Sequence, residues 1–205
     1  MQNKAKNNMY KAKKNQVDFV LVIIILILLS FGIVMILSAS APSALAETGN
    51  SYTYVTKQVI FAVVGLILMW VISKIDYRKY KKFYWVIYWI SVGILLLVLI
   101  PGLGTEGGGA KRWINLGFTQ FQPSELTKIG LIIFYAGYLT DHKSELRSFT
   151  KGFLKPIFFL LPPILIALFI QNHLSVGIVI SAITFIMMLM AGCRLIHFIV
   201  FGGIG

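Results

Sequence analysis

Long runs of uncharged, mostly apolar residues are the feature that most constrains the fold of this chain. Such runs cover residues 19–41, 83–105 and 174–193. Each reaches the roughly 20 residues that a helix needs to cross a bilayer core of about 30 Å. Strands of membrane barrels are about half that length and alternate in polarity, which these runs do not. Since 58% of residues are hydrophobic and 13% are charged, the sequence predicts an all-α polytopic membrane protein.

Six transmembrane helices are predicted, at about residues 18–40, 54–74, 83–101, 123–140, 156–172 and 174–193. A seventh is predicted to begin near Leu195. The residues that follow Leu195 are too few to cross a membrane, so we expect the chain to be a fragment of a longer protein, with a short re-entrant tail as the alternative. Residues 1–17 are predicted to form a basic tail. Residues 18–205 then form one transmembrane domain, with an outer loop at 101–123 and shorter outer segments at 41–53 and 172–174.

Basic residues predict the orientation of these helices. Most of the 19 Lys and Arg residues lie in the N-terminal tail and in the predicted loops 75–82 and 141–155. Cytoplasmic loops carry an excess of Lys and Arg, so we expect a multi-pass protein of the cell membrane with a cytoplasmic N-terminus. The net charge of +12 follows from this topology, and attraction to anionic membrane lipid is a secondary effect. Nucleic acid is not an expected partner, because the charge is split among short loops.

A charged stretch lies in the predicted outer loop and at the start of the fourth span. It reads GAKRWINLG at 109–117 and QPSELTK at 122–128. Charge at membrane depth is costly and therefore marks candidate functional residues. Arg binds phosphate oxygens through two donors and Lys as a point charge, which favours a phosphate-bearing substrate. The candidate substrate-binding residues are Lys111, Arg112, Trp113, Gln122, Ser124, Glu125 and Lys128.

Structural roles remain open for several of these residues. Trp113 suits an anchor at the membrane–water boundary as well as a ligand contact. Pro123 favours a first helical turn, in which Glu125 complements the positive end of the helix. Glu125 and Lys128 are three residues apart, so they share one helical face and can form a purely structural pair. Lys111, Arg112 and Lys128 together nevertheless carry more charge than one carboxylate neutralises.

Two other sequence patterns predict no cofactor site. Residues 102–107 read GLGTEG and match GxGxxG, but a dinucleotide site needs a strand before the glycines and a βαβ unit around them. A membrane helix precedes these glycines instead, and they predict a mobile loop or backbone amides that can approach an anion. His142, His173 and His197 stand at spacings that no metal ligand set uses, so no structural metal is predicted.

The motif at 109–128 resembles the signature of the SEDS family, whose members include FtsW, RodA and SpoVE. Supporting matches are LSASA at 37–41, KQ at 57–58, IDY at 75–77 and IPGLG at 100–104. The SAS and QPSE details resemble the FtsW/SpoVE branch more than the RodA branch. The similarity extends over nearly the whole chain, and its central motif is long and specific.

This resemblance implies a peptidoglycan glycosyltransferase that polymerises lipid II on the outer face of the cytoplasmic membrane, in division, elongation or sporulation. It implies a class B penicillin-binding protein as partner, together with other divisome or elongasome membrane proteins. It also implies about ten spans, and it assigns the catalytic aspartate to a loop between spans seven and eight, beyond residue 205. We therefore assign no catalytic residue here and expect the fragment alone to be inactive. A divalent cation, Mg²⁺ or Mn²⁺, remains an open expectation.

The reaction implied by the resemblance transfers a glycosyl group from a lipid pyrophosphate. A base deprotonates the acceptor 4-hydroxyl of one lipid II, which attacks the anomeric carbon of the growing strand. Arg112, Lys111 and Lys128 would stabilise the developing charge on the pyrophosphate. Trp113 would position sugar or lipid, and Glu125 would orient Lys128.

His173 departs from the family pattern, because QNHLS at 171–175 stands where many members read QPDLG. The residue could titrate near neutral pH or pair with Glu125, and a neutral ring bonded to the backbone is the state we expect. Two other functions stay open for the chain. One is a flippase that transports a lipid-linked precursor, and the other is a non-catalytic scaffold of the divisome.

Overall fold

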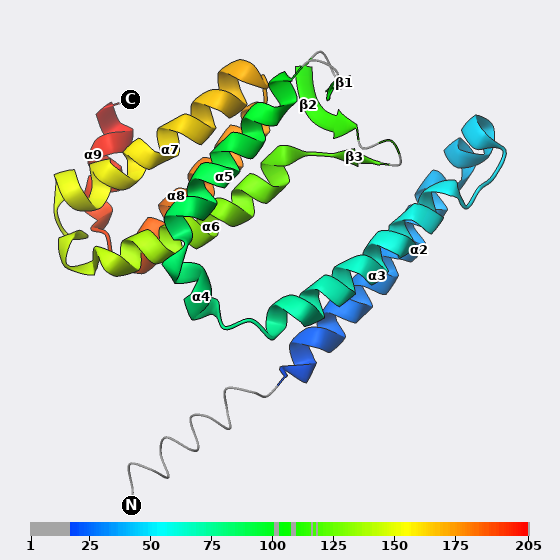
Figure 1. The fold of residues 1–205 in the computed structure, drawn as a ribbon, viewed down its shortest axis with the longest axis horizontal. Helices are drawn as coiled ribbons and strands as arrows, with labels where there is room; N and C mark the ends of the chain where they lie inside the picture. Colours follow the sequence, from blue (N-terminus) through cyan, green and yellow to red (C-terminus); the bar gives the residue numbers. More distant parts are fainter. Residues whose placement is uncertain (1–16, 101–102, 108–109, 116, 118, 205) are drawn as a thin grey trace, which may run out of the picture. The chain divides into compact units, whose positions relative to one another are not determined.

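The computed structural model describes residues 17–204, except 101–102, 108–109, 116 and 118. The predicted basic tail therefore lies outside the described residues, apart from Val17. The chain separates into two compact units, Met1–Ile75 and Asp76–Gly205. The first contains two long helices, and the second contains the remaining helices and a small sheet (Figure 1).

The first unit consists of α2 (Phe19–Thr48) and α3 (Thr53–Ser73). Asp18 caps α2, since its carboxylate accepts a hydrogen bond from the backbone N–H of Leu21 over 3.1 Å. The helix continues through Pro42 and ends at Gly49, whose φ of 72° is left-handed. Most of the predicted outer segment 41–53 is therefore helix rather than loop. A proline removes only one helical donor, and the residues after Pro42 continue the helix.

The second unit is built around helices that lie alongside one another, with the sheet at one end (Figure 1). Its helices are α4 (Tyr77–Lys82), α5 (Tyr84–Leu96), α6 (Pro123–Asp141), α7 (Lys155–Leu165), α8 (Leu174–Ala191) and α9 (Leu195–Ile204). Short 3₁₀ turns are η1 (Leu97–Leu99) and η2 (Lys143–Glu145), and π-helical segments are η3 (Phe149–Leu154) and η4 (Ile166–Ile170). The strands are β1 (Gly104–Gly107), β2 (Ala110–Asn115) and β3 (Gln120–Phe121).

Small residues let α5 and α6 approach closely. A Cβ added to Gly130 would lie 1.8 Å from Oγ of Ser91, and one added to Gly137 would lie 2.7 Å from the ring of Tyr84. Glycine at a helix interface allows this kind of contact in membranes. Thr127 adds a hydrogen bond to the carbonyl of Ser91 over 3.1 Å. The two helices on either side of the charged loop are thus fixed against each other.

Four helical stretches in the described part are long and apolar enough to cross a membrane: α2, α3, the continuous helix Phe149–Ile170, and α8. The apolar stretch Tyr84–Leu99 is shorter. These helices confirm a multi-pass helical protein. The helix Phe149–Ile170 begins earlier than the predicted 156–172, because Gly152 lets η3 pack on the preceding turn. A Cβ there would lie 2.5 Å from the carbonyl oxygen of Glu145.

The predicted outer loop 101–123 contains an antiparallel sheet in the order β1-β2-β3, which departs from the all-α prediction. Within it, Gly104–Gly107 is strand rather than a mobile loop. A second strand follows these glycines instead of a helix, so the GxGxxG match is not a dinucleotide-binding turn. Pairing in the sheet satisfies backbone N–H and C=O groups, and it buries Ile114, which is 6% exposed.

Candidate functional site

A β-bulge in the sheet places Arg112 outside the regular pairing. Thr105 of β1 pairs with Trp113, whereas the next residue, Glu106, pairs with Lys111. Arg112 is therefore the extra residue on β2 and has no partner on β1. Bulges redirect the side chain of the extra residue and increase the local twist.

The redirected Arg112 side chain reaches the segment between η4 and α8. Its Nε donates to the carbonyl oxygen of Gln171 over 3.2 Å, and its Nη2 donates to the carbonyl oxygen of Asn172 over 2.7 Å. Asn172 has a φ of 46°, a left-handed conformation that Asn tolerates better than most residues. In the described part of the chain no carboxylate pairs with Arg112. The guanidinium thus holds β2 to the start of α8.

Gln171 extends this connection to α5. The residue is 1% exposed, and its side-chain Nε2 donates to the carbonyl oxygen of Leu95 over 3.1 Å. A buried side-chain amide is normally hydrogen-bonded, and the Leu95 carbonyl meets this need. Gln171 was not among the predicted site residues. The available signal was its position, a polar residue between two long apolar helices.

His173 contacts Gln122, so the residues that precede α6 and α8 meet. Nε2 of the imidazole lies 3.0 Å from Nε2 of Gln122. Because an amide nitrogen can only donate, the ring nitrogen accepts and the imidazole is neutral in this arrangement. Burial lowers the pKa of His173 below its ordinary 6.5, and the charge of Arg112 lowers it further. Among the described residues the ring bonds to Gln122 rather than to Glu125 or the backbone, and Glu125 pairs with Lys128 instead.

Glu125 and Lys128 form the ion pair that their spacing predicts. Nζ of Lys128 lies 2.8 Å from each carboxylate oxygen of Glu125. Pro123 occupies the first turn of α6 and Glu125 follows it, which confirms the predicted helix start. The Glu125 side chain is 56% exposed and that of Lys128 is 24% exposed. The pair is neutral overall, so the excess positive charge among the described side chains at this end of α6 resides on Arg112.

The other candidate residues differ in their surroundings. Ser124 is fully buried, and its Oγ has no hydrogen-bond partner among the described residues. Trp113 is half-buried in β2. The backbone of Lys111 pairs with Glu106, whereas its side chain lies outside the described part.

The described side chains of this site offer few oxygen ligands for a divalent cation. The described residues contain no group of three or more His, Cys, Asp or Glu side chains that could hold an ion. The carboxylate of Glu125 is already bound to Lys128. A Mg²⁺ or Mn²⁺ ion here would have to obtain most of its oxygen ligands from a substrate phosphate.

Comparison with known proteins assigns the chain to a family. Residues 19–205 match the FtsW/RodA/SpoVE family, described as cell cycle protein. The chain belongs to the FtsW/RodA/SpoVE family. It is 35% identical to stage V sporulation protein E of Bacillus subtilis over 193 residues, which cover 94% of this chain and 52% of that protein. It is 37% identical to the probable peptidoglycan glycosyltransferase FtsW of Trichlorobacter lovleyi over 179 residues, which cover 87% of this chain and 47% of the relative.

Solved structures of the FtsW/RodA/SpoVE family share the fold. A chain from a structure of a peptidoglycan synthase complex, described as coordinating polymerization and crosslinking, matches with a TM-score of 0.65 and 26% identity. The match covers 83% of this chain and 50% of that one. The rod shape determining protein RodA of Thermus thermophilus matches with a TM-score of 0.59 and 24% identity, over 83% of this chain and 56% of RodA. The chain thus spans about half the length of the curated relatives it matches.

Proposed function

We propose that this chain is part of a peptidoglycan glycosyltransferase that polymerises lipid II on the outer face of the cell membrane. Family membership supports the reaction, since relatives in the FtsW/RodA/SpoVE family are named probable peptidoglycan glycosyltransferases. The observation that carries the proposal is the positive site at the start of α6. There Arg112 of β2 has no carboxylate partner among the described residues, and Lys128 lies one turn into a helix whose positive end faces the same loop.

The proposed topology has six spans and the start of a seventh, with the N-terminus in the cytoplasm. The spans are α2, α3, α5 with η1, α6, Phe149–Ile170 and α8, followed by α9. Two of these spans, Tyr84–Leu99 and α6, are not among the four helical stretches that are long and apolar enough by themselves. The stretch Tyr84–Leu99 is short, which bilayer thinning can accommodate. The helix α6 carries Glu125, Lys128 and Asp141 near its ends, where charged groups can reach the membrane surface.

In the proposed reaction, the acceptor 4-hydroxyl oxygen of lipid II attacks the anomeric carbon of the growing strand. The bond from that carbon to the lipid pyrophosphate breaks, and a base takes the hydroxyl proton. By family resemblance, the base is an aspartate in a loop beyond residue 205. Arg112, Lys111 and Lys128 would stabilise the charge that develops on the departing pyrophosphate. Trp113 would position sugar or lipid at the interface.

Arg112 can serve this reaction and still hold the loop in place. A guanidinium has five N–H donors in a planar fork. The bonds to the carbonyls of Gln171 and Asn172 use two of them, and the others can face a phosphate oxygen. Lys128 is also held in place, since both carboxylate oxygens of Glu125 contact its ammonium group. The Arg112 and Lys128 side chains of the proposed substrate site are therefore held in position before a substrate arrives.

The proposed partner is a class B penicillin-binding protein, with other divisome or elongasome membrane proteins as further candidates. The similarity in fold to a chain of a peptidoglycan synthase complex supports a partner of this kind.

The decisive experiment measures polymerisation of fluorescent lipid II by the full-length protein, purified together with its class B penicillin-binding protein. We expect glycan strands from the parent protein and an approximately 100-fold lower rate from Arg112→Ala or Lys128→Ala, as for the loss of one donor to a transition-state oxyanion. Residues 1–205 alone should make no strands.

Two results would overturn the proposal. If the full-length protein with its partner makes no strands but moves lipid-linked precursor across vesicles, the transporter alternative is correct. If Arg112→Ala and Lys128→Ala both fold, bind the partner and polymerise at the parent rate, the substrate site lies elsewhere. A scaffold instead predicts lower partner binding with unchanged activity per folded molecule.

A further inference from the structure

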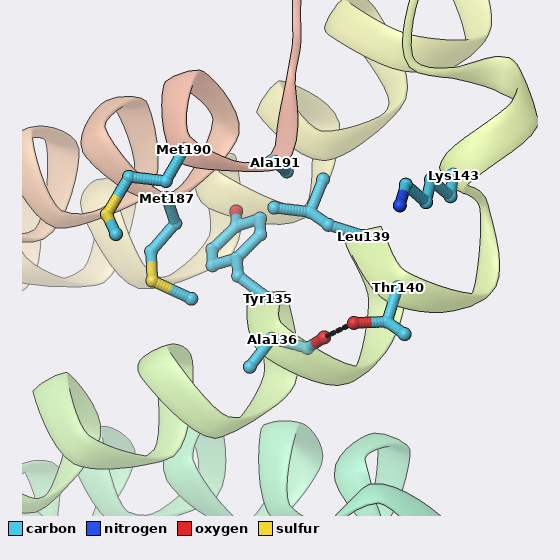
Figure 2. Close-up of a pocket in the computed structure, with 8 residues that line it drawn as sticks. All are labelled: Tyr135, Ala136, Leu139, Thr140, Lys143, Met187, Met190 and Ala191. Carbon is cyan, nitrogen blue, oxygen red and sulfur yellow. Dashed lines mark hydrogen bonds between the residues drawn. The ribbon is translucent and has the colours of Figure 1, made fainter.

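A groove between α6 and α8 lies away from the loop that carries the charged stretch. It has a volume of about 380 Å³, and its walls come from the C-terminal halves of the two helices. The walls are apolar, with Tyr135 and Leu139 on α6 and Met187, Met190 and Ala191 on α8. Lys143, just beyond α6, closes one end. Figure 2 shows the two methionines at the opposite end from Lys143, whose nitrogen is turned toward Leu139.

The polar groups of the groove are already used, with the exception of the Lys143 ammonium. The Tyr135 hydroxyl donates to the carbonyl oxygen of Pro156 over 2.9 Å. The Thr140 hydroxyl donates to the carbonyl oxygen of Ala136 over 2.6 Å (Figure 2). Neither hydroxyl therefore has a proton left for a ligand. A ligand of this groove would meet an apolar surface and one cation.

The carboxylates next to Lys143 are engaged by other lysines. Nζ of Lys81 lies 2.6 Å from the carboxylate of Asp141, and Nζ of Lys151 lies 3.9 Å from that of Glu145. Within the described part of the chain, no acidic side chain pairs with Lys143. The charge at the end of the groove therefore complements an anion from outside the protein.

The groove is open toward the surroundings of the helices. Met190 is 82% exposed, and α8 is apolar and long enough to cross a membrane. Methionine side chains are flexible and adapt to irregular apolar ligands. Basic pockets between membrane helices, near the membrane surface, bind the headgroups of anionic lipids. An apolar groove that ends in one cation has the lining and charge of such a site.

We propose that this groove binds an anionic phospholipid, with one acyl chain between α6 and α8 and the phosphate at Lys143. The site is separate from the proposed lipid II site, because it lies at the end of α6 opposite to Glu125 and Lys128. It depends on one element of the proposed topology, that the end of α6 near Asp141 lies at the membrane surface.

Native mass spectrometry of the detergent-solubilised full-length protein, titrated with phosphatidylglycerol or phosphatidylcholine, tests the proposal. We expect preferential retention of phosphatidylglycerol, and at least a fivefold weaker affinity for it in Lys143→Gln. The matched control is Lys79→Gln, which removes the same charge from an exposed position on α4 and should leave the affinity unchanged. Ala136→Phe keeps Lys143 but fills the groove, and it should weaken binding as well. Inorganic phosphate should not compete, because the acyl chain supplies most of the contact.

Several outcomes would overturn the proposal. Equal losses in Lys143→Gln and Lys79→Gln would show that binding depends only on overall charge. Full binding in Ala136→Phe would show that the lipid lies outside the groove. If Met190→Cys forms a disulfide-linked dimer in vesicles and phosphatidylglycerol does not reduce its yield, a second copy of the chain covers the groove instead. Melting temperatures close to that of the parent would exclude misfolding as the cause of lost binding.

Discussion

Nη2 of Arg112 donates to the carbonyl oxygen of Asn172 over 2.7 Å, although the two residues are 60 positions apart in the sequence. This bond attaches the outer sheet to the start of α8. A substitution at Arg112 therefore changes the geometry of the loop as well as its charge. The predictions for this residue must separate these two effects.

Arg112→Lys separates charge from geometry. Lysine retains the positive charge but cannot bond both carbonyls through a rigid fork. We expect the variant to lose about 0.5–1.5 kcal/mol of local stability, the usual net contribution of an intramolecular hydrogen bond, and much of the polymerisation rate. Thermal unfolding and lipid II polymerisation of the full-length protein measure the two effects. A variant with parent stability and parent rate would show that the charge alone matters.

The Glu125–Lys128 pair should matter for activity more than for stability. Partly exposed ion pairs contribute about 0–1 kcal/mol to folding, so Lys128→Met should leave the melting temperature nearly unchanged. We expect its polymerisation rate to fall about 100-fold. Glu125→Gln should have a smaller effect, because the amide can still orient the ammonium. A large fall in the melting temperature of Lys128→Met that accounts for its loss of rate would contradict the substrate role.

Acidification should destabilise the contact between Gln122 and His173. Burial and Arg112 lower the folded-state pKa of His173 below 6.5, so the unfolded chain takes up a proton first as pH falls. The contribution of neutral His173 to the free energy of unfolding is therefore complete above about pH 6.5. It is lost as the pH falls toward the folded-state pKa. Lys128 opposes protonation and Glu125 favours it.

Melting temperatures at pH 7.5 and 5.5 measure this effect. His173→Gln, which keeps a side-chain partner for Gln122, should reduce the difference between the two pH values. An unchanged difference in the variant would assign the pH dependence to other groups.

Gly130→Ala should destabilise the contact between α5 and α6. The new methyl group would lie 1.8 Å from Oγ of Ser91, and overpacking of this kind costs about 1–3 kcal/mol. Ser91→Gly in the same molecule should restore part of the stability. The matched control is Gly93→Ala on α5, where an added Cβ meets nothing within 4 Å. A melting temperature in Gly130→Ala as high as that in Gly93→Ala would contradict the close packing.

Cysteine labelling tests the proposed orientation. With Cys193 replaced by Ala, a membrane-impermeant thiol reagent should modify a cysteine at Thr105 in intact cells. It should not modify one at Lys79 until the membrane is permeabilised, because the positive-inside rule assigns that loop to the cytoplasm. The reverse pattern would overturn the orientation and the outer location of the site.

The sequence predicted the helices best where hydrophobic length alone determines them. The helices α3, α6 and α8 lie within two residues of their predicted positions. The end of α2 was predicted poorly, because Pro42 is tolerated within the helix. Strands are usually recognised by alternating polar and apolar residues. This pattern could not predict β2, since the bulge places Arg112 outside the regular pairing.

The candidate site was predicted partly, because its local contacts are visible in the sequence and its distant contacts are not. The Glu125–Lys128 pair follows from helical spacing. The bonds of Arg112 to residues 171 and 172 depend on how α8 packs, and no spacing rule indicates them. The contact of His173 with Gln122 was likewise not indicated by the sequence.

The bulge at Arg112 makes the length of β1 as important as its composition. One residue inserted between Thr105 and Glu106 would give Arg112 a partner and restore regular pairing. Side chains then alternate between the two faces of the sheet, so a different side chain would face α8. Epitope tags and loop exchanges in this region therefore cannot be treated as silent. A one-residue insertion there should disturb the protein more than many single substitutions.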